Sequence, residues 1–567
     1  MTSTQGQQSL KLVEAQERSE LLDVTGYDVT LDLTREATFD SLTRITFTSR
    51  GGPTFLDVKP EQLRRVHLNG APVDPTLLDR GRLPLQTSVG DNELVVEAVM
   101  AFRNDGEGLH RSVDPADGKA YVYGMSFMDA APSIAACFDQ PDLKAPWTFH
   151  VRAPEDWTVF GNAPGLEVEP GSWEFETSQP LSTYFVTLVA GPWHVVRSEH
   201  DGIPLSLSCR ASIAEHLDAD VPELFRLTEQ CFDEFHRLFG IRYPFGNYHQ
   251  AFVPEFNAGA MENPGCVTFR DPMIFTSKVT RGERIQRATT IAHEMAHQWF
   301  GNIVTPVWWD DLWLNESFAE YMGNRVTATA TEYADAWDQL AWTRRQWGLV
   351  ADRAPSTHPV AGNGAVDATA ALQDFDGISY AKGSSILKQL NARLGDDVFF
   401  SGVIDHFERH RFGNATMHDL IASWERAGAG DLAGFRDSWL LTSGLDSLTL
   451  DRTTGVLVRR APESEPADRD HRTSVARWSP GEPSWTVAPV MVDADRVPLD
   501  AAPDEAVVVD PREETWALTS VDPTTLGLLP GPSRRRPTPR SAPLRGTACA
   551  AGGTTPTSTL PRRPSSR

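Results

Sequence analysis

The sequence predicts a multidomain α+β protein. Its 567 residues exceed what a single hydrophobic core organises, and 40% hydrophobic with 23% charged residues is typical of a globular chain. Apolar residues alternate in the first part of the chain, recur at helical spacing in the middle and return to short β patterns after it. We therefore expect a β-rich domain at 1–200, a helical domain at 201–448, a small β domain at 449–530 and a tail at 531–567.

The β-rich prediction begins with residues 27–33, where Tyr27, Val29, Leu31 and Leu33 alternate with polar residues. This alternation is typical of half-buried strands, and similar strand and turn signals continue to about residue 189. From about residue 213 the apolar residues follow helical spacing, and helices are expected to about residue 441. Short β signals return at residues 456–458, 490–492 and 507–509.

The tail at 531–567 holds eight arginines and no acidic residue, among many Pro, Ser, Thr and Gly. Its apolar content is too low to form a core, so we expect it to be disordered. A nucleic-acid-binding arm would also be basic, but the tail has no aromatic residue to stack on bases. The chain as a whole carries a net charge of −25, which disfavours nucleic acid as a partner.

A metal-binding pattern lies in the predicted helical domain. His293 and His297 are four residues apart, so on a helix both imidazoles lie on one face and can bind one Zn²⁺, with Glu294 beside the metal. Glu316, in a second predicted helix, supplies a third ligand and leaves a fourth position for water, as in catalytic zinc sites. Such a zinc lowers the pKa of its water from about 15.7 towards about 7. Glu294 then serves as the general base.

The alternative is a pair of surface histidines on an amphipathic helix. The surrounding pattern disfavours it, because apolar residues recur at helical spacing and predict a buried helix. The extended zinc-protease form HExxHxxGxxH is excluded, because Phe300 and Ile303 stand where it requires glycine and histidine. The apolar positions are Ile285, Ala288, Ile291, Ala292, Met295, Ala296 and Trp299.

With its other motifs, the sequence resembles the M1 family of zinc aminopeptidases, the aminopeptidase N group. The match extends from about residue 11 to about residue 530. The GAMEN pentapeptide ahead of the zinc helix is close to diagnostic for this family. The motifs are CFDQPD at 137–142, GAMEN at 259–263, GCVTFRD at 265–271, HEMAHQWFG at 293–301, Glu316, and YAKG at 380–383.

The resemblance implies a saddle-shaped N-terminal sheet domain, a thermolysin-like (gluzincin) catalytic domain and a small β-sandwich. It implies that Tyr380 stabilises the oxyanion and that Glu262 binds the free α-ammonium of the substrate. Asp129 is the nearest candidate for the second amine-binding residue of the family. The resemblance also makes the GAMEN residues an edge that pairs with the substrate backbone, namely Gly259, Ala260, Met261, Glu262 and Asn263.

Some assignments remain open. Glu320 lies one helical turn after Glu316 and is either a carboxylate that orients a zinc-binding histidine or a solvated one. Asp310 and Asp311 receive no role. Ala258 is smaller than the methionine of the best-known members, so their side-chain preference is not carried over. GAMEN with alanine second favours ordinary aminopeptidases over the epoxide-hydrolysing branch.

We therefore expect a zinc metallo-aminopeptidase that removes the N-terminal residue of peptides with a metal-activated water. Relatives usually continue into a large helical domain over the active site, and from the composition of the tail we expect that domain to be missing here. The alternative is accordingly an inactive or weakly active truncated scaffold with an intact zinc site.

We expect one Zn²⁺ per chain, peptide substrates with a free amine, no nucleic-acid or membrane partner, and a monomer. No stretch has the roughly 18 apolar residues of a membrane span, and residues 1–20 have no apolar signal core. Five cysteines without a CxxC pair indicate reduced thiols, so a cytoplasmic location is expected.

Overall fold

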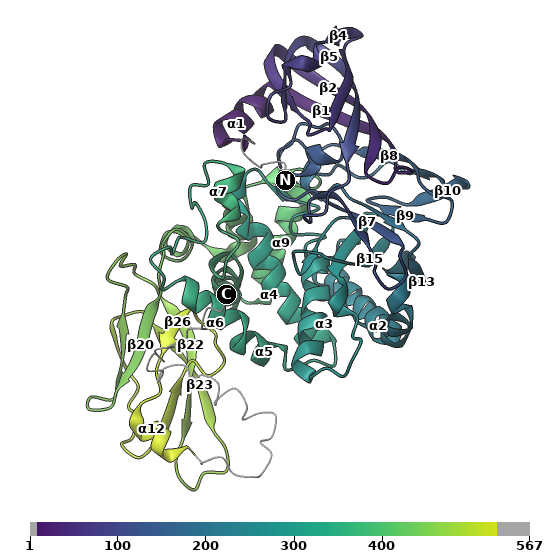
Figure 1. Cartoon of the computed structure of the whole chain (residues 1–567). Helices are drawn as coiled ribbons and strands as arrows, with labels where there is room; N and C mark the ends of the chain where they lie inside the picture. The colour runs from purple at the N-terminus through teal and green to yellow at the C-terminus, as the bar shows by residue number, and fades with distance from the viewer. Residues whose placement is uncertain (1–7, 530–567) are drawn as a thin grey trace, which may run out of the picture.

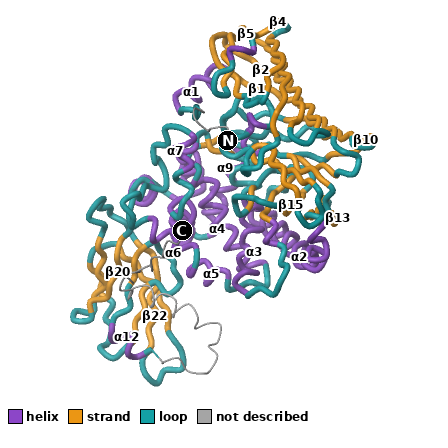
Figure 2. Tube along the Cα trace, viewed as in Figure 1, coloured by secondary structure: helices purple, strands orange, loops and turns teal. Residues whose placement is uncertain are grey.

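The computed structural model describes residues 8–529 and shows a mixed α+β, multidomain chain with an N-terminal β domain. Figure 1 shows β layers at the top, helices in the middle and a second β region at the lower left; Figure 2 shows the same division by secondary structure. The predicted tail at 531–567 lies outside the described residues. Within residues 8–529, no helix is both long enough and apolar enough to cross a membrane.

The first sheet has eight strands, and its two long central strands, β2 and β5, pair in antiparallel register over most of their length. Buried and exposed residues alternate along β1, with Tyr27, Val29 and Leu31 facing the core. The order is β10 (Gly165–Glu169), β11 (Ser172–Phe175), β8 (Trp147–Arg152), β1 (Leu22–Asp32), β2 (Thr38–Asp57), β5 (Arg82–Ala101), β3 (Gln62–Leu68) and β4 (Ala71–Val73).

Two further sheets connect this layer to the helices. A four-stranded sheet has the order β6 (Gly108–Val113), β7 (Ala120–Met125), β12 (Leu188–Gly191) and β9 (Thr158–Gly161). A five-stranded mixed sheet has the order β13 (His194–His200), β14 (Ile203–Cys209), β15 (Tyr248–Val253), β17 (Cys266–Arg270) and β16 (Ala260–Met261). The β13–β14 hairpin spans both sides of the predicted division at residue 200, and that division stays a prediction.

Helices form the middle of the molecule. The predicted amphipathic helix after residue 213 is α2 (Ala214–Phe239), which ends at Gly240 in the left-handed conformation that favours glycine. The helices α3 (Arg281–Ala296) and α4 (Trp313–Ala330) pack against each other and against α2. The remaining helices are α5 (Ala336–Trp342), α6 (Arg344–Ala351), α7 (Ala368–Leu372), a π-helical turn (Ile378–Lys382), α8 (Gly383–Leu394), α9 (Asp396–Arg409), α10 (Met417–Trp424) and α11 (Ala433–Phe435).

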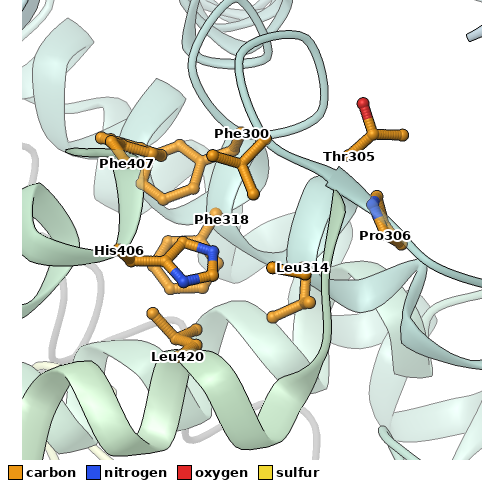
Figure 3. A pocket seen from close by; sticks show the side chains of 10 residues that line it. Phe300, Thr305, Pro306, Leu314, Phe318, His406, Phe407 and Leu420 are labelled. Atoms are coloured by element: carbon orange, nitrogen blue, oxygen red, sulfur yellow. The ribbon is translucent and has the colours of Figure 1, made fainter. Parts of the chain in front are cut away.

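A small void lies in the helical core, beside α4, α9 and α10. Its volume is about 10 Å³, close to the lower limit for one water molecule, so it holds no ligand. Figure 3 shows the His406 imidazole between Phe407, Phe318 and Leu420 at this void. Burial lowers the pKa of His406 to about 3, so the ring is neutral and serves packing.

The last region consists of two sheets that share one apolar core. Leu448 and Leu457 of the first sheet pack with Val475 and Val507 of the second. The first has the order β24 (Arg496–Pro498), β21 (Val456–Arg460), β20 (Asp446–Asp451) and β26 (Ala517–Thr519), and the second β23 (Thr486–Val492), β22 (His471–Trp478) and β25 (Ala506–Val509), followed by α12 (Pro523–Leu528).

Buried polar contacts join this β region to the helices. The ammonium of Lys382 donates to Asp352 at 3.2 Å and to the carbonyl of Gly444 at 3.1 Å. The other Asp352 oxygen accepts a hydrogen bond from the Trp516 indole at 2.8 Å. The segment that carries Tyr380 is therefore held by residues from both regions.

An N-terminal helix, α1 (Leu12–Leu21), was not expected from the β pattern of the first domain. It carries Arg18, which is only 2% exposed. The guanidinium donates to Asp57 of β2 at 2.6 Å, to the Gln140 side chain at 2.5 Å and to the carbonyl of Asp139 at 3.0 Å. One buried cation therefore joins α1, the first sheet and the CFDQPD segment.

Replacing Arg18 by methionine is expected to destabilise the protein strongly. The substitution leaves the buried Asp57 carboxylate without its cation, and breaking such a pair costs about 3–5 kcal/mol. The matched control is Arg44→Met, which removes an exposed pair with Glu93 and should cost less than about 1 kcal/mol. Urea titration followed by circular dichroism distinguishes the two. Equal midpoints would contradict a structural role for Arg18.

Candidate metal centre and active-site cleft

The helix α3 begins at a capping box that fixes its start relative to the sheet. The backbone N–H of Glu283 donates to the Thr280 hydroxyl at 3.2 Å, and the N–H of Thr280 donates to the Glu283 carboxylate at 2.6 Å. His293 lies in the last turn, and His297 is the first residue after the helix. The N–H of His297 still donates to the carbonyl of His293, so the two imidazoles keep the spacing of a helical turn.

The helix α4 brings carboxylates to these imidazoles because it packs unusually close to α3. At Gly323, an added Cβ would lie 3.0 Å from the backbone nitrogen of His293 and 3.1 Å from the carbonyl oxygen of Thr289. Even a methyl group at this position would require the two helix backbones to move apart by a few tenths of an ångström. Glu316 and Glu320, which precede Gly323 on the same helix, therefore lie against the histidine pair.

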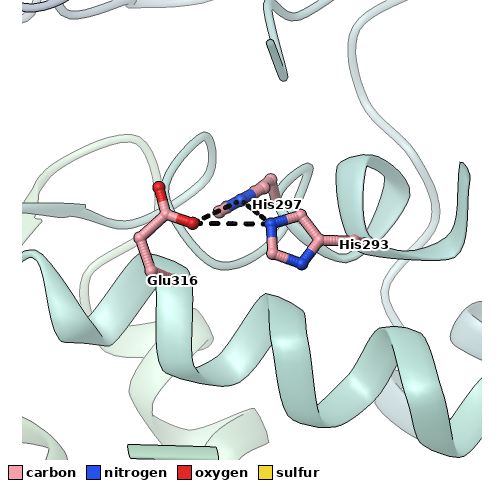
Figure 4. Close-up of side chains that lie close together, drawn as sticks. All are labelled: His293, His297 and Glu316. Carbon is pink, nitrogen blue, oxygen red and sulfur yellow. Dashed lines mark hydrogen bonds and ion pairs between the residues drawn. The ribbon is translucent and has the colours of Figure 1, made fainter. Parts of the chain in front are cut away.

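His293, His297 and Glu316 converge on one point, as Figure 4 shows. The two Nε2 atoms are 3.0 Å apart, and the Oε2 atom of Glu316 lies 3.4 Å from each of them. Ligands at about 2.0–2.1 Å from a tetrahedral zinc are separated by about 3.3–3.4 Å, so these three atoms fit that ion. Within residues 8–529, the buried Oε2 of Glu316 receives no hydrogen bond. A bound cation would satisfy it.

Neighbouring groups orient the imidazoles. The Nδ1 atom of His297 lies 3.1 Å from the carbonyl oxygen of Phe300, so Nδ1 carries the proton and Nε2 is free to bind a metal. The Nδ1 atom of His293 lies 3.7 Å from Glu320, which Arg344 holds through two hydrogen bonds of 2.9 and 3.1 Å. Glu320 is only 5% exposed, which excludes the solvated alternative.

The centre holds an excess of negative charge. Burial raises the pKa of Glu294 well above its usual range and also raises that of Glu262. Burial opposes the charging of His297, yet Glu262 and Glu316 raise its pKa to about 10. For Glu316, burial is outweighed by the two histidines, and its pKa is lowered. Several carboxylates in a buried space require a compensating cation, in agreement with the metal-binding geometry.

The GAMEN segment lies beside this cluster. Its residues Ala260 and Met261 form β16, the edge strand of the five-stranded sheet. The carboxylate of Glu262 approaches Glu294 and His297 closely, with one ligand atom of each within 4.8 Å of the others. The Asn263 amide donates to the Thr268 hydroxyl at 3.4 Å, and space is open at the Gly259 Cα.

Two residues that the sequence did not single out fix the Glu262 backbone. The side-chain amides of Gln298 and Asn302 donate to the Glu262 carbonyl at 3.1 and 2.9 Å. The sequence could have indicated them by their spacing, because Gln298 and Asn302 follow Glu294 by four and eight residues. At helical spacing this places all three residues on one side of α3 and of the segment that follows it. The zinc helix and the GAMEN segment are thereby joined directly.

A cleft of about 430 Å³ opens from the cluster. Its walls are formed by Ala258, Gly259 and Ala260 on the strand side, by α3, and by residues of α4 and α6. The ring of Tyr380 lines it as well, with its centroid 6.1 Å from that of His293 and the Arg344 guanidinium 4.9 Å above the phenol. Burial and the nearby Glu316 raise the pKa of Tyr380 well above its usual range, so the phenol remains a hydrogen-bond donor.

Asp129 does not line this cleft. Its side chain is half-buried, and its backbone carbonyl accepts a hydrogen bond from the Lys59 ammonium at 2.5 Å. Two residues earlier, Phe127 packs against Phe375, which does line the cleft. The amine-binding role of Asp129 stays a prediction.

Comparison with known proteins decides the family. A family model described as "Peptidase family M1 domain" matches residues 224–439, which include β16, α3 and α4. A second model, described as "Peptidase M1 N-terminal domain", matches residues 83–185. The chain belongs to peptidase family M1. The resemblance drawn from its motifs is thereby confirmed, and the helical region holds the M1 catalytic domain.

Several M1 relatives carry aminopeptidase names. The chain is 42% identical to the aminopeptidase N of Streptomyces lividans over 514 residues, which cover 86% of this chain and 59% of the relative. It is 32% identical to a leucyl aminopeptidase of Saccharolobus solfataricus, over 55% of this chain and 40% of the relative. It is 31% identical to the aminopeptidase N of Canis lupus familiaris, over 63% and 39%. The chain thus spans about half the length of these relatives.

Substituting alanine for Gly323 should weaken zinc binding. The added methyl group pushes α4 away from α3, and such overpacking costs about 1–3 kcal/mol. If this cost falls on the metal geometry, the dissociation constant rises about 5- to 140-fold. The control is Gly434→Ala, because a Cβ at Gly434 meets no atom within 4 Å. Zinc competition with a chromophoric chelator measures both variants. Identical constants would show that the helix contact does not set the metal geometry.

Glu320→Gln tests whether this carboxylate supports His293. Loss of a group that orients a metal-binding histidine costs about 10–100-fold in metal affinity. We expect that loss in the same chelator competition, with the thermal transition of the metal-free protein little changed. Glu332→Gln, an exposed carboxylate paired with Arg226, serves as the control. Wild-type affinity in Glu320→Gln would remove Glu320 from the metal centre.

Proposed function

We propose that this chain is a zinc-dependent aminopeptidase, which removes the N-terminal residue of peptides. The observation that carries the proposal is the set of three ligand atoms, 3.0–3.4 Å apart, beside a cleft that His293, Glu294 and Ala260 of the edge strand β16 line. Two imidazoles and one carboxylate leave a coordination position for water, which is the composition of catalytic zinc sites.

We assign the metal to His293, His297 and Glu316, one Zn²⁺ per chain. When bound, zinc supplies a Lewis acid that acidifies water and polarises the peptide carbonyl. Glu294 accepts the proton of the attacking water and passes it to the leaving amine. Burial raises the pKa of its carboxyl, which makes the carboxylate a stronger base for the first step. Tyr380, still protonated, donates a hydrogen bond to the developing oxyanion.

Glu262 distinguishes an aminopeptidase from an endopeptidase in this proposal. Its carboxylate is 5% exposed and lies at the end of β16, next to the metal cluster. A free α-ammonium would pair with it, whereas an internal residue of a longer peptide brings no charge there. The substrate backbone would extend along Gly259, Ala260 and Met261 by strand addition, with Asn263 bracing the turn.

The same proposal includes the finer description of the fold and setting. We interpret the N-terminal sheets as the saddle-shaped domain, the helical region as thermolysin-like and the two final sheets as a β-sandwich, with divisions near residues 200, 448 and 530. Four described cysteines are buried and unpaired, which supports a reducing, cytoplasmic setting. We propose a monomer that acts on peptides, with no nucleic-acid or membrane partner.

The alternative was an inactive or weakly active scaffold. We favour the enzyme because His293, Glu294 and Tyr380 line the cleft, because Glu262, His297 and Glu316 cluster with these residues, and because the relatives named above carry aminopeptidase names. A scaffold that only binds peptides has no need for a buried carboxylate next to an open metal position.

Hydrolysis of aminoacyl aryl amides tests this function. The full chain should release the aryl amine, and chelation of the metal should abolish release. Glu294→Gln, which removes the base but keeps the size of the side chain, should lower kcat by about 10²–10⁴-fold while zinc content is retained. Chelator-insensitive release, or full activity in the variant, would refute the proposal.

Substrates with an acetylated amine test the role of Glu262. Acetylation removes the ammonium, so wild-type kcat/KM should fall by about tenfold or more, and Glu262→Gln should lose most of this discrimination. Equal cleavage of free and acetylated substrates by the wild type would show that the amine is not recognised. Chelator-sensitive activity would in that case still identify an endopeptidase.

A further inference from the structure

Among the described residues, one arginine that lines the cleft is held by no hydrogen bond or ion pair. Arg270, the last residue of β17, is exposed and lines both the cleft of about 430 Å³ and a neighbouring hollow of about 510 Å³. Within residues 8–529 its guanidinium makes no hydrogen bond or ion pair. Its neighbour Asp271 is within electrostatic range but is bound by Arg210, so the Arg270 guanidinium is available to bind an anion.

The other arginines that line the cleft or the neighbouring hollow are already paired. Arg344 is held by Glu320, Arg287 bonds Asp220 at 2.5 Å, and Arg210 bonds Asp271 at 2.7 Å. Each of these guanidinium groups satisfies a carboxylate of the fold. Arg270 differs from them, because its neighbour Asp271 is taken by Arg210. Among these arginines, the lack of an ion pair is therefore specific to Arg270.

The backbone fixes Arg270 at a defined distance from the metal centre. Its N–H donates to the carbonyl of Gly259 at 3.1 Å, and the preceding pairs are Ala260 with Phe269 and Met261 with Thr268. Arg270 thus lies one step beyond β16, on the side away from Glu262. The distance along the strand from Met261 to Gly259 is two residues, or about 7 Å.

This register places Arg270 relative to a bound peptide. With its amine at Glu262, a peptide that adds to β16 runs antiparallel to it, with residue one beside Met261, residue two beside Ala260 and residue three beside Gly259. The bond to be cleaved lies between residues one and two, next to Glu294. The third residue then lies beside Gly259 on the free edge of β16, with that strand between it and β17. Its backbone is about 9–10 Å from that of Arg270, two strand spacings away, so only the long arginine side chain, which lines the cleft, can reach it.

We propose that Arg270 binds the carboxylate of the third substrate residue, so that the enzyme prefers tripeptides with a free C-terminus. The proposal rests on the aminopeptidase function above and adds a substrate class to it. A guanidinium matches a carboxylate through two parallel N–H···O bonds, and its exposure keeps the interaction modest and sensitive to salt. An acidic side chain at the third position would use the same contact.

Matched peptides measure this preference. Trialanine is compared with trialanine amide, which differs only in the terminal charge, and the same pair is made for lengths two, four and five. For the wild type we expect the kcat/KM ratio of acid to amide to be highest at length three. Arg270→Met should reduce that ratio about fivefold, and Arg270→Glu should reduce it further, because the charge is reversed.

The comparison of ratios removes effects that both peptides share, including any loss of folded or zinc-loaded enzyme. Arg50→Met is the control, since Arg50 is an exposed arginine on the N-terminal sheet without a hydrogen bond or ion pair among the described residues, and it should keep the wild-type ratio. Raising the salt concentration should lower the ratio in the wild type and leave it constant in Arg270→Met.

The outcomes separate the two proposals. A ratio that is the same in the wild type and Arg270→Met, or that has no maximum at length three, overturns the role of Arg270 while peptide hydrolysis upholds the aminopeptidase. If neither the peptides nor the aryl amides are cleaved in a chelator-sensitive manner, the aminopeptidase function itself fails and this inference with it.

Discussion

The contact between α3 and α4 at Gly323 is the constraint on which the site depends. One helix supplies two imidazoles whose separation is set by the helical turn, but two ligands do not make a closed metal site. The third must come from another element at a separation of about 3.4 Å. Because no side chain intervenes at Gly323, α4 can place one carboxylate on the metal position and another, one turn later, behind His293.

Charge balance explains why so many polar residues surround this contact. Glu262, Glu294 and Glu316 lie close together in a buried space, which is costly without a cation. The proposed metal would neutralise part of this charge, and Arg344 pairs with Glu320. Gln298 and Asn302 contact Glu262 through its backbone carbonyl and not through its carboxylate. The carboxylate of Glu262 therefore remains free for the cationic amine of the proposed substrate. In that proposal, binding of the substrate also reduces the unfavourable negative charge of the site.

The sequence predicted those parts of the site that depend on short-range geometry. The spacing of His293 and His297 determines their relation once a helix is assigned, and the alternation at Tyr27, Val29 and Leu31 determines which side of β1 is buried. Contacts between distant segments left no such signal. Gly323 resembles any helical glycine until α3 is packed against it, and Arg344 acquires its partner through tertiary structure alone. Asp129 was chosen by distance along the sequence, which does not determine which residues line a cleft.

The shortness of β16 has a consequence for the whole molecule. Unpaired backbone N–H and C=O groups on an edge strand can pair with other chains, and long, flat edge strands are sites of aggregation. Here the edge strand β16 is only two residues long, and the buried residue Glu262 follows it. It offers enough pairing groups for the first few residues of a peptide and too few to template a second copy of the protein. The molecule can therefore keep a permanently open hydrogen-bonding surface in solution without assembling through it.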